Sequence, residues 1–376
     1  MKLLLIADTT YIRCGWGRYT FNILKEFRAR NIDYVVFTNS LSPEKSQVPI
    51  SHEYQSLLPP KNIKNLIANV LLIRKHLTSD VDAVHAFDCW PFAVYALLSS
   101  FGKKINTFIS GVGTYSVPPE QISFKRFVMK LAYMRSKMTF SISSYTERKI
   151  LTSVPKAKIK TVHWGTSTLP ELTPDRIEKF IDIFNIPRKR FPIILTVGQI
   201  KHRKGQIDTL EAVSLLKEKY PSILYVVVGD DGDVQYVEKM KQTAKKLNIS
   251  DNLKIITNQK TDKELAFFYS ICDIFAMNSN NESDHFEGFG LVFLEAAQFG
   301  KPAIGSAGCG IEDAIADGQT GFLCRQGDEE DIAKKIDTLL SGNLEKFGAN
   351  ARLRGKEFTW QKTVKSYLAA YEANED

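Results

Sequence analysis

Cysteine and histidine are scarce in this chain, with five and six copies among 376 residues. The cysteines are odd in number and widely spaced, at Cys14, Cys89, Cys272, Cys309 and Cys324. They fit neither a paired disulfide framework nor the spacing of a zinc site. This pattern predicts a reducing, cytoplasmic compartment and gives no sign of a structural metal.

Long apolar runs are also missing. No stretch reaches the roughly 18–20 consecutive apolar residues that a membrane-spanning helix requires, and residues 92–101 come nearest to it. The first ten residues hold a single lysine and an apolar run of five residues, which is too short for the core of a signal peptide. We therefore expect a buried first strand at 3–7.

Acidic residues are nearly absent from one part of the chain. Between Phe101 and Lys160 the sequence holds twelve Lys or Arg residues against two acids, Glu120 and Glu147, whereas the whole chain carries a net charge of +8. Such a concentration of one sign suggests a polyanionic partner or an anionic surface. Because no nucleic-acid-binding motif accompanies it, we expect no nucleic-acid partner.

Within this basic region, the segment 123–138 interleaves basic residues with aromatic and aliphatic ones. Two interpretations carry equal weight. A basic aromatic helix can lie on an anionic membrane, which would place the protein at the inner face of the membrane. The same pattern also fits a core-facing helix with a solvated basic face.

Short apolar runs alternate with amphipathic stretches along the chain, and the pattern occurs twice. Helical periodicity marks stretches such as 209–220 and 237–247. Strands that alternate with helices form parallel sheets covered on both faces. The expected strands are 3–7, 34–38, 82–87, 106–110, 139–143 and 160–164, then 192–198, 223–229, 253–257, 273–278 and 302–306.

This alternation predicts an α/β protein with two Rossmann-like, doubly wound parallel-sheet domains that face a cleft. Ligands are then expected at the carboxyl ends of the strands. The segment 166–190 lacks a strand and contains three prolines, so we place the domain junction there. The expected domains are 1–170 and 171–356, followed by a final helix in 357–376.

The stretch FEGFGLVFLEAAQFGKPAIG contains the strongest chemical signal. Glycines flank Phe289 directly after Glu287, and a helix is expected from Leu291. Glycine permits close backbone approach, and free amides at a helix start bind anions. Glu287 in the loop and Glu295 inside the helix would frame a ligand with central phosphates and hydroxyl groups at both ends, such as a nucleotide sugar. The alternative is one carboxylate exposed in a turn and another favoured by the helix dipole.

A second cluster, Lys201, His202, Arg203 and Lys204, follows the strand expected at 192–198 and precedes a helix. Cations at the exit of a strand are what a diphosphate leaving group requires. Four basic residues in one loop also fit a solvated surface, and this second interpretation stays open.

A glycine pair, Gly15 and Gly17, follows the first expected strand and precedes a helical apolar stripe. Such a pair can cradle a phosphate between a strand and a helix. The GxGxxG spacing of dinucleotide-binding proteins is absent, because Thr20 replaces the third glycine. Asp8 and Arg18 are candidate neighbours of a ligand there, or ordinary surface charges.

The stretch 287–296 resembles the signature of the retaining GT-B glycosyltransferases of family 4, in which two glutamates are separated by seven residues. The similarity extends over nearly the whole chain. It implies that Glu287 and the amides after it hold the donor sugar, and that Glu295 holds the nucleotide ribose. Those amides belong to Gly288, Phe289, Gly290 and Leu291.

The same resemblance assigns an arginine and a lysine of the basic loop to the donor phosphates. Lys204 matches the lysine, whereas Gln199 stands where the usual arginine follows the strand-end glycine. Arg203 is therefore expected to take over the role of that arginine. The glycine-rich first loop, with Gly15 and Gly17, is implied to approach the donor phosphates or the acceptor.

One element of the resembling family is missing. Many relatives place a histidine in the loop after the fourth strand, near the reacting sugar carbon, whereas this chain has Ser110, Gly111 and Val112 there. A backbone carbonyl, or the hydroxyl of Ser110 or Thr114, is expected to substitute. Ser110, Gly111 and Thr114 thus form the expected acceptor-side loop.

The resemblance also implies transfer of a hexose by front-face attack, with retained anomeric configuration. The expected donor is a nucleoside-diphosphate sugar, with UDP-glucose or a related UDP-sugar as first choice. The expected acceptor is a glycan or a lipid-linked glycan of polysaccharide, lipopolysaccharide or glycolipid biosynthesis. The domain 1–170 would face this acceptor, and the last helix would cross back towards it.

No cofactor is expected besides the sugar nucleotide, and no essential metal. The sequence Asp231-Gly232-Asp233 resembles the metal-binding DxD of another glycosyltransferase class, but its place after an expected strand favours a simple turn. Two other functions stay open. One is a sugar-nucleotide epimerase of the same fold, which would need further acid and base residues. The other is a non-catalytic protein that binds nucleotide sugars or polyanions.

Overall fold

The computed structural model describes residues 1–10, 15–40, 54–189, 191–230, 232–258 and 261–373. The chain divides into two compact units, one of Met1–Gly165 together with Thr359–Asp376, the other of Thr166–Phe358. The boundaries expected after residues 170 and 356 therefore lie five residues beyond and two residues before those of the structure. The end of the chain belongs to the same unit as its beginning.

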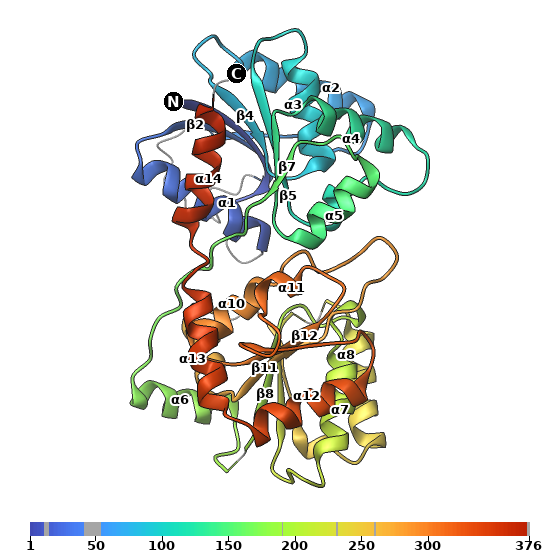
Figure 1. Ribbon diagram of the computed structural model, residues 1–376, viewed down its shortest axis with the longest axis vertical. Helices are drawn as coiled ribbons and strands as arrows, with labels where there is room; N and C mark the ends of the chain where they lie inside the picture. Colours follow the sequence, from blue (N-terminus) through green and yellow to red (C-terminus); the bar gives the residue numbers. More distant parts are fainter. Residues whose placement is uncertain (11–14, 41–53, 190, 231, 259–260, 374–376) are drawn as a thin grey trace. The chain divides into compact units, whose positions relative to one another are not determined.

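The first unit contains one sheet of seven parallel strands in the order β3-β2-β1-β4-β5-β6-β7 (Figure 1). The order reverses beside β1, which pairs with β2 on one side and β4 on the other. Parallel α/β sheets bind ligands at such a reversal. The strands are β1 (Lys2–Thr9), β2 (Asp33–Ser40), β3 (Tyr54–Ser56), β4 (Ala83–Ala86), β5 (Asn106–Gly111), β6 (Met138–Ser141) and β7 (Ile159–Thr161).

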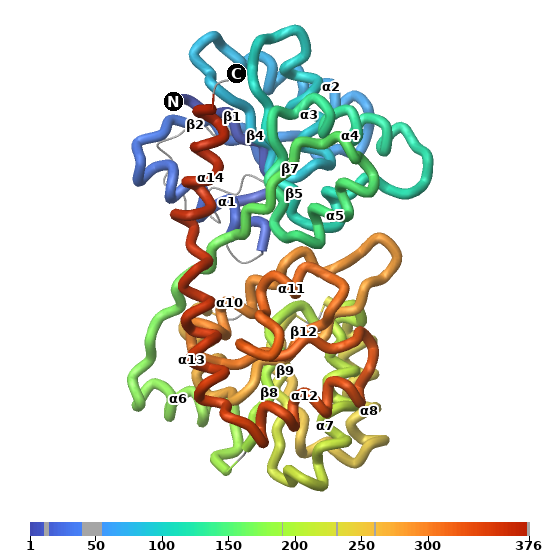
Figure 2. Tube along the Cα trace, in the orientation of Figure 1, coloured from blue at the N-terminus to red at the C-terminus, as the bar shows by residue number. Residues whose placement is uncertain are grey.

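Among the described residues, six α-helices flank this sheet. They are α1 (Gly15–Ala29), α2 (Ile63–His76), α3 (Val94–Ser100), α4 (Phe124–Arg135), α5 (Ser144–Ser153) and α14 (Trp360–Glu372). Helices α2, α3 and α4 lie side by side, and α14 packs against α1 (Figure 2). In the described part of the chain, no helix has both the length and the apolar character that crossing a bilayer requires.

The second unit repeats this topology with six parallel strands in the order β10-β9-β8-β11-β12-β13. The strands are β8 (Ile193–Val197), β9 (Leu224–Val228), β10 (Leu253–Ile256), β11 (Ile274–Met277), β12 (Ala303–Ser306) and β13 (Gly321–Cys324). The helices are α6 (Pro174–Phe184), α7 (Gln206–Leu216), α8 (Val234–Lys246), α9 (Asp262–Ile271), α10 (Leu291–Gln298), α11 (Ile311–Ala314), α12 (Glu329–Ser341) and α13 (Leu344–Gly355). The α/β class and the two Rossmann-like sheets expected from the sequence are thereby confirmed.

The apolar runs become strands because both faces of each sheet are covered. Every residue of β8 and of β9 is buried, as expected for central parallel strands. The two strands that the sequence pattern missed, β3 and β13, lie at sheet edges and have three and four residues.

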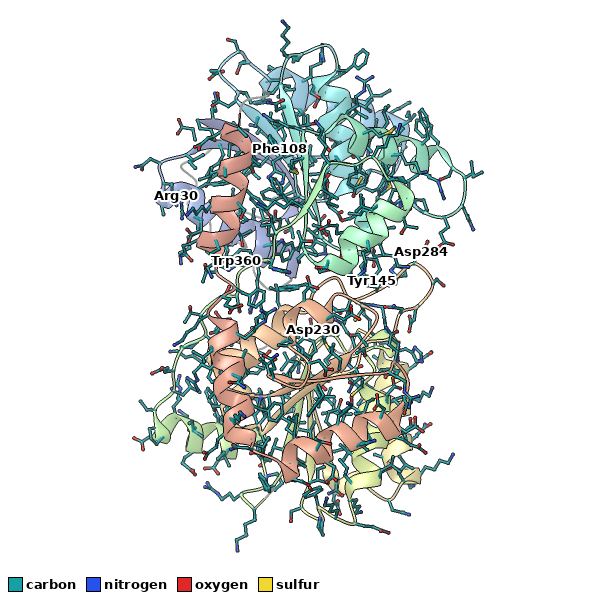
Figure 3. The ribbon with its side chains drawn as sticks, in the orientation of Figure 1. Arg30, Phe108, Tyr145, Asp230, Asp284 and Trp360 are labelled. Atoms are coloured by element: carbon teal, nitrogen blue, oxygen red, sulfur yellow. The ribbon has the colours of Figure 1, made fainter. Side chains whose placement is uncertain are left out.

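A buried polar network fastens α14 to the first sheet. The hydroxyl of Tyr367 lies 3.0 Å from that of Tyr19, and the hydroxyl of Tyr371 lies 2.5 Å from Nδ1 of His85. Burial lowers the pKa of His85 to about 3, so its imidazole is neutral at physiological pH. Figure 3 labels Trp360, where α14 begins. His85 therefore has a structural place in the core.

Candidate active site

The candidate site lies at the carboxyl-terminal edge of the second sheet. Strands β8 and β11 pair there although they are not consecutive in the chain, so the loops that follow them leave the sheet side by side. Figure 3 labels Asp230 and Asp284, which belong to the loops after β9 and β11 at this edge. The pairing of β8 with β11 marks the reversal of strand order at which ligands bind in such sheets.

The structure brings the three predicted charged residues together. Nζ of Lys204 lies 2.5 Å from Oε2 of Glu287, and Nη1 of Arg203 lies 3.5 Å from the same oxygen. All three side chains are largely buried, with exposed fractions of 14–17%. The basic loop after β8 and the acidic loop after β11 therefore form one cluster rather than two solvated surfaces.

Opposing effects set the pKa of Glu287. Burial alone would raise it, but the charges of Lys204 and Arg203, and to a smaller extent that of Lys201, bring it below its ordinary value. The carboxylate is therefore ionised throughout the neutral range. Burial lowers the pKa of Lys201, and repulsion from its two cationic neighbours lowers it further.

A glycine fixes the basic loop against the end of β11. Gly205 has a φ of +64°, and a Cβ atom there would lie 1.8 Å from the carbonyl oxygen of Asn278. The amide of Asn280 donates to the carbonyl of Arg203 at 2.8 Å. Only glycine allows this approach of the two backbones, which explains why it follows Lys204 directly.

Helix α10 begins at Leu291, as expected. Its N-cap is Gly290 in the left-handed region, at a φ of +86°, and no side chain of the described residues caps the first turn. The amides at this helix start are therefore available to an anion, and the helix dipole favours negative charge there. Phe289 is buried against Phe358, with ring centroids 5.7 Å apart, so its side chain packs while its backbone lines the loop.

Gly310, which no sequence pattern singles out, holds the acidic loop in place. Its amide donates to the carbonyl of Glu287 at 2.8 Å. A Cβ atom at this position would lie 2.0 Å from the carbonyl oxygen of Gly288. The loop after β12 thus packs backbone to backbone against the loop of Glu287. No local sequence motif predicts this contact between separate chain segments.

Glu295 lies in the second turn of α10 and is buried. Its Oε2 accepts a hydrogen bond of 2.8 Å from the hydroxyl of Tyr269, on α9. The carboxylate is thus oriented by a neighbouring helix within the same unit. Its expected role as the ribose ligand stays a prediction.

Buried polar atoms without a hydrogen-bond partner gather near this edge. Among the described residues they include Asn278 Oδ1 and Ser279 Oγ after β11, Ser306 Oγ at the end of β12, and Gln206 Oε1 at the start of α7. These four side chains are fully buried. Unpaired buried polar atoms are costly and require an explanation, and a hydroxyl-rich ligand would satisfy them. The sequence pattern gave no sign of them.

Gly15 and Gly17 fall in the first turn of α1 rather than in a loop before it. Gly15 is exposed, and among the described residues nothing lies within 4 Å of a Cβ atom added to it. None of the described residues therefore requires a glycine at this position. Residues 11–14, which connect this helix to the first strand, lie outside the described residues.

The three residues of the expected acceptor-side loop have different surroundings. Ser110, at the end of β5, is fully buried, and its Oγ lies 2.6 Å from the hydroxyl of Tyr19 and 2.9 Å from Nε2 of His85. The Ser110 hydroxyl thus makes its hydrogen bonds within the buried polar network. Gly111 is buried next to it, whereas Thr114 starts a short turn and is half-buried.

Asp88, a buried carboxyl group just beyond β4, was not singled out from the sequence. Its Oδ1 accepts hydrogen bonds from the amide of Cys89 at 2.6 Å and from Oγ of Ser116 at 2.5 Å. Burial raises its pKa to about 8, helped by the charge of Asp8 and opposed by these hydrogen bonds and by Lys125. A protonated carboxyl group at the strand reversal of the first sheet can donate a hydrogen bond to a ligand hydroxyl.

The segment that resembles a metal-binding DxD provides the N-cap of a helix. Oδ1 of Asp233 accepts a hydrogen bond of 2.9 Å from the amide of Tyr236 and so caps α8. Asp231 lies outside the described residues. Across the parts of the chain that are described, no group of three or more His, Cys, Asp or Glu side chains is placed to hold a metal ion.

Comparisons with known proteins cover almost the whole chain. The family described as Glycosyltransferase Family 4 matches residues 14–168, and the family described as Glycosyl transferases group 1 matches residues 178–354. The D-inositol 3-phosphate glycosyltransferase of Geodermatophilus obscurus is 32% identical over 187 residues, which are 48% of this chain and 40% of that protein. The matches span less than half the length of such relatives.

Solved structures share the fold. A glycosyltransferase from Rickettsia africae ESF-5 matches 99% of this chain and 97% of its own, with a TM-score of 0.85 and 21% identity. The Anabaena protein Alr3699/HepE, in complex with UDP and glucose, matches 98% of both chains, with a TM-score of 0.78 and 19% identity. The fold, the signature stretch and both family matches agree, and the chain belongs to the family 4 glycosyltransferases of GT-B fold.

Proposed function

We propose that this glycosyltransferase moves a hexose from a UDP-sugar, such as UDP-glucose, to a hydroxyl group of a glycan or lipid-linked acceptor, with retained anomeric configuration. The observation that carries the proposal is the buried Glu287, paired with Lys204 and Arg203 beside the uncapped start of α10. The Anabaena structure in complex with UDP and glucose supports this class of donor.

The charges of the cluster suit a diphosphate. The charges of Lys201, Arg203 and Lys204 all act on the carboxylate of Glu287, and these four residues carry a formal net charge of +2 when all are ionised. A sugar diphosphate carries roughly one negative charge per phosphate, and cations in a partly buried site stabilise such charge more strongly than in water. The amides at the start of α10 add further positive potential.

In the proposed reaction the bond between the anomeric carbon and the phosphate oxygen breaks, and its electron pair leaves with the diphosphate. The acceptor hydroxyl oxygen forms the new bond on the same face of the sugar. Its proton passes to the departing phosphate oxygen, so the products are the glycoside and UDP. Lys204 and Arg203 stabilise the negative charge that develops on the leaving group.

Glu287 acts in this proposal as an anchor for the donor sugar. An ionised carboxylate accepts hydrogen bonds from sugar hydroxyl groups, and the depressed pKa of Glu287 keeps it ionised. Its two cationic neighbours reduce its strength as a nucleophile. Paired carboxylates of the kind that glycosidases use are therefore not required.

We further propose that transfer needs neither a metal nor a cofactor, because the cations and helix amides supply the positive charge that a metal would otherwise provide. We place the reaction in the cytoplasm. The acceptor is a growing glycan of polysaccharide, lipopolysaccharide or glycolipid assembly, and the segment 123–138 is the part of the chain that we expect to meet an anionic membrane.

The test is an incubation with a panel of UDP-sugars and glycan or lipid-linked acceptors in the presence of EDTA. We expect UDP release coupled to a new glycoside whose anomeric configuration, read by NMR, matches that of the donor. Interconversion of the donor sugar without UDP release would instead establish an epimerase. Tight donor binding without any turnover would instead indicate a non-catalytic protein that binds nucleotide sugars.

A further inference from the structure

Exposed apolar side chains are concentrated in one part of the first unit. Of the 17 large apolar side chains that are exposed among the described residues, 11 lie between Leu58 and Met134. Three of them follow one another along α2, where Ile63, Ile67 and Leu71 have exposed fractions of 63%, 50% and 61%. Because they are four residues apart, they share one face of this helix.

Helix α4 carries a second exposed stripe. Phe124 and Phe127 have exposed fractions of 73% and 64%, and Met134 continues the same face two turns later. The opposite side of the helix is buried, with Met129 and Tyr133 in the core. The two interpretations left open for 123–138 therefore apply to different faces: one side of the helix packs on the core, and the other presents aromatic rings to solvent.

The three neighbouring helices form a single surface because they share one core. Ile73 of α2, Tyr95 of α3 and Met129 of α4 belong to the same buried cluster. Side chains also tie the first two helices together: Nδ2 of Asn69 donates to the hydroxyl of Tyr95 at 3.2 Å, and Nη1 of Arg74 donates to the carbonyl of Ser99 at 2.9 Å. We call the outward faces of α2, α3 and α4 the three-helix surface (Figure 1).

This surface carries charge of one sign only. The three helices contain no acidic residue, whereas Lys64 and Lys75 on α2 and Lys130 and Arg135 on α4 supply positive charge. A second copy of the chain would meet like charge there. A nucleic acid would match the charge but would leave the aliphatic stripe of α2 without a partner. An anionic lipid bilayer satisfies both features, with phosphates for the lysines and acyl chains for the apolar side chains.

We propose that the three-helix surface docks on an anionic lipid bilayer. The apolar side chains of α2 and α4 enter the boundary between headgroups and acyl chains, and the basic residues contact lipid phosphates. The inference extends the expectation for 123–138 to α2, whose sequence suggested no membrane contact. It deepens the proposed function, on which it rests for one point only: a docked enzyme would receive a lipid-linked acceptor at the membrane surface.

The experiment is co-sedimentation of the full chain with vesicles of phosphatidylglycerol and phosphatidylcholine, or of phosphatidylcholine alone. We expect binding to the anionic vesicles that weakens with added salt. The double variants F124S/F127S and I67S/L71S should each weaken binding about tenfold or more. The free energy of burying one large apolar side chain corresponds to a change of more than tenfold in the binding constant. The matched control L215S/L353S replaces exposed leucines of the second unit and should bind normally.

Donor binding, measured by thermal shift with UDP, separates this proposal from the transfer reaction. The variants on α2 and α4 should keep the donor response of the wild type. Equal binding to both kinds of vesicle, or an unchanged affinity in I67S/L71S, would overturn the three-helix surface. Vesicle binding without any response to UDP or to UDP-sugars would support the docking and refute the proposed donor.

Discussion

Nζ of Lys204 lies 2.5 Å from Oε2 of Glu287, although 83 residues separate the two in the chain. The contact joins the loop after β8 to the loop after β11 at the strand reversal of the second sheet. It makes the two loops one electrostatic unit, in which the lysine keeps the glutamate ionised and the glutamate orients the lysine.

Replacement of Lys204 by methionine should lower kcat/KM by about a hundredfold to a thousandfold, the effect typical of removing one group that stabilises developing charge. It should also raise the pKa of Glu287, because that carboxylate loses its nearest cation. Steady-state UDP release measures the first effect. The control K239M removes an exposed lysine of α8 and should be silent. Near-normal activity of K204M would contradict the assigned role.

Two glycine variants test whether packing within the protein or contact with a ligand requires a glycine. G310A should lower the free energy of unfolding by about 1–3 kcal/mol, as overpacking does, because its Cβ atom would lie 2.0 Å from the carbonyl oxygen of Gly288. It should also weaken donor binding by displacing the loop of Glu287. In G15A the added Cβ atom would meet no described residue within 4 Å, so we expect the fold to tolerate it.

G15A thus tests directly whether the backbone at Gly15 contacts a ligand. If the backbone near Gly15 approaches the donor phosphates or the acceptor, G15A should weaken ligand binding or raise the acceptor KM while chemical denaturation shows unchanged stability. An alanine variant with wild-type kinetics would mean that this glycine is no part of the binding site.

Ser110 can be tested as a structural residue or as an acceptor contact. S110A should lower the free energy of unfolding by about 1–3 kcal/mol, because it leaves the buried partners His85 and Tyr19 short of a hydrogen bond. Donor affinity and the acceptor KM should stay close to those of the wild type. An increased acceptor KM with unchanged stability would instead support the acceptor-side role expected from the sequence.

Asp88 should make stability depend on pH. Its pKa is about 8 in the folded protein and about 4 in an unfolded chain. Between these values the folded state holds a proton that the unfolded state has lost. The stabilisation is therefore complete below about pH 4 and decreases as the pH rises to about 8. Urea unfolding of D88N, which cannot ionise, should lack this part of the slope. Parallel pH profiles of the two proteins would refute the raised pKa.

The sequence predicted most of what depends on local pattern. Apolar runs such as ILYVVVG become fully buried strands, and the glycines around Phe289 do precede a helix that starts at Leu291. The two loops with Lys204 and Glu287 could be assigned to one site because both follow strands that parallel sheets place at the same edge.

What could not be predicted depends on contacts between distant segments. The need for a glycine at position 310 exists only because the loop after β12 packs on the carbonyl of Gly288. The raised pKa of Asp88 arises from burial, which its position after a short apolar run does not reveal. Ser110 occupies the end of the expected strand, but the direction of its hydroxyl is set by His85 and Tyr19 from two other elements.

The most direct test of the central claim is the rate of UDP release from the preferred UDP-sugar by the wild type, by E287Q and by the control E238Q. Glutamine keeps the shape of Glu287 but removes the charge that Lys204 and Arg203 hold in place. We expect E287Q to retain its fold and its affinity for UDP while UDP release falls by about a hundredfold or more. E238Q, altered at an exposed position of α8, should match the wild type. Undiminished release by E287Q would contradict the proposed role of Glu287 in holding the donor sugar.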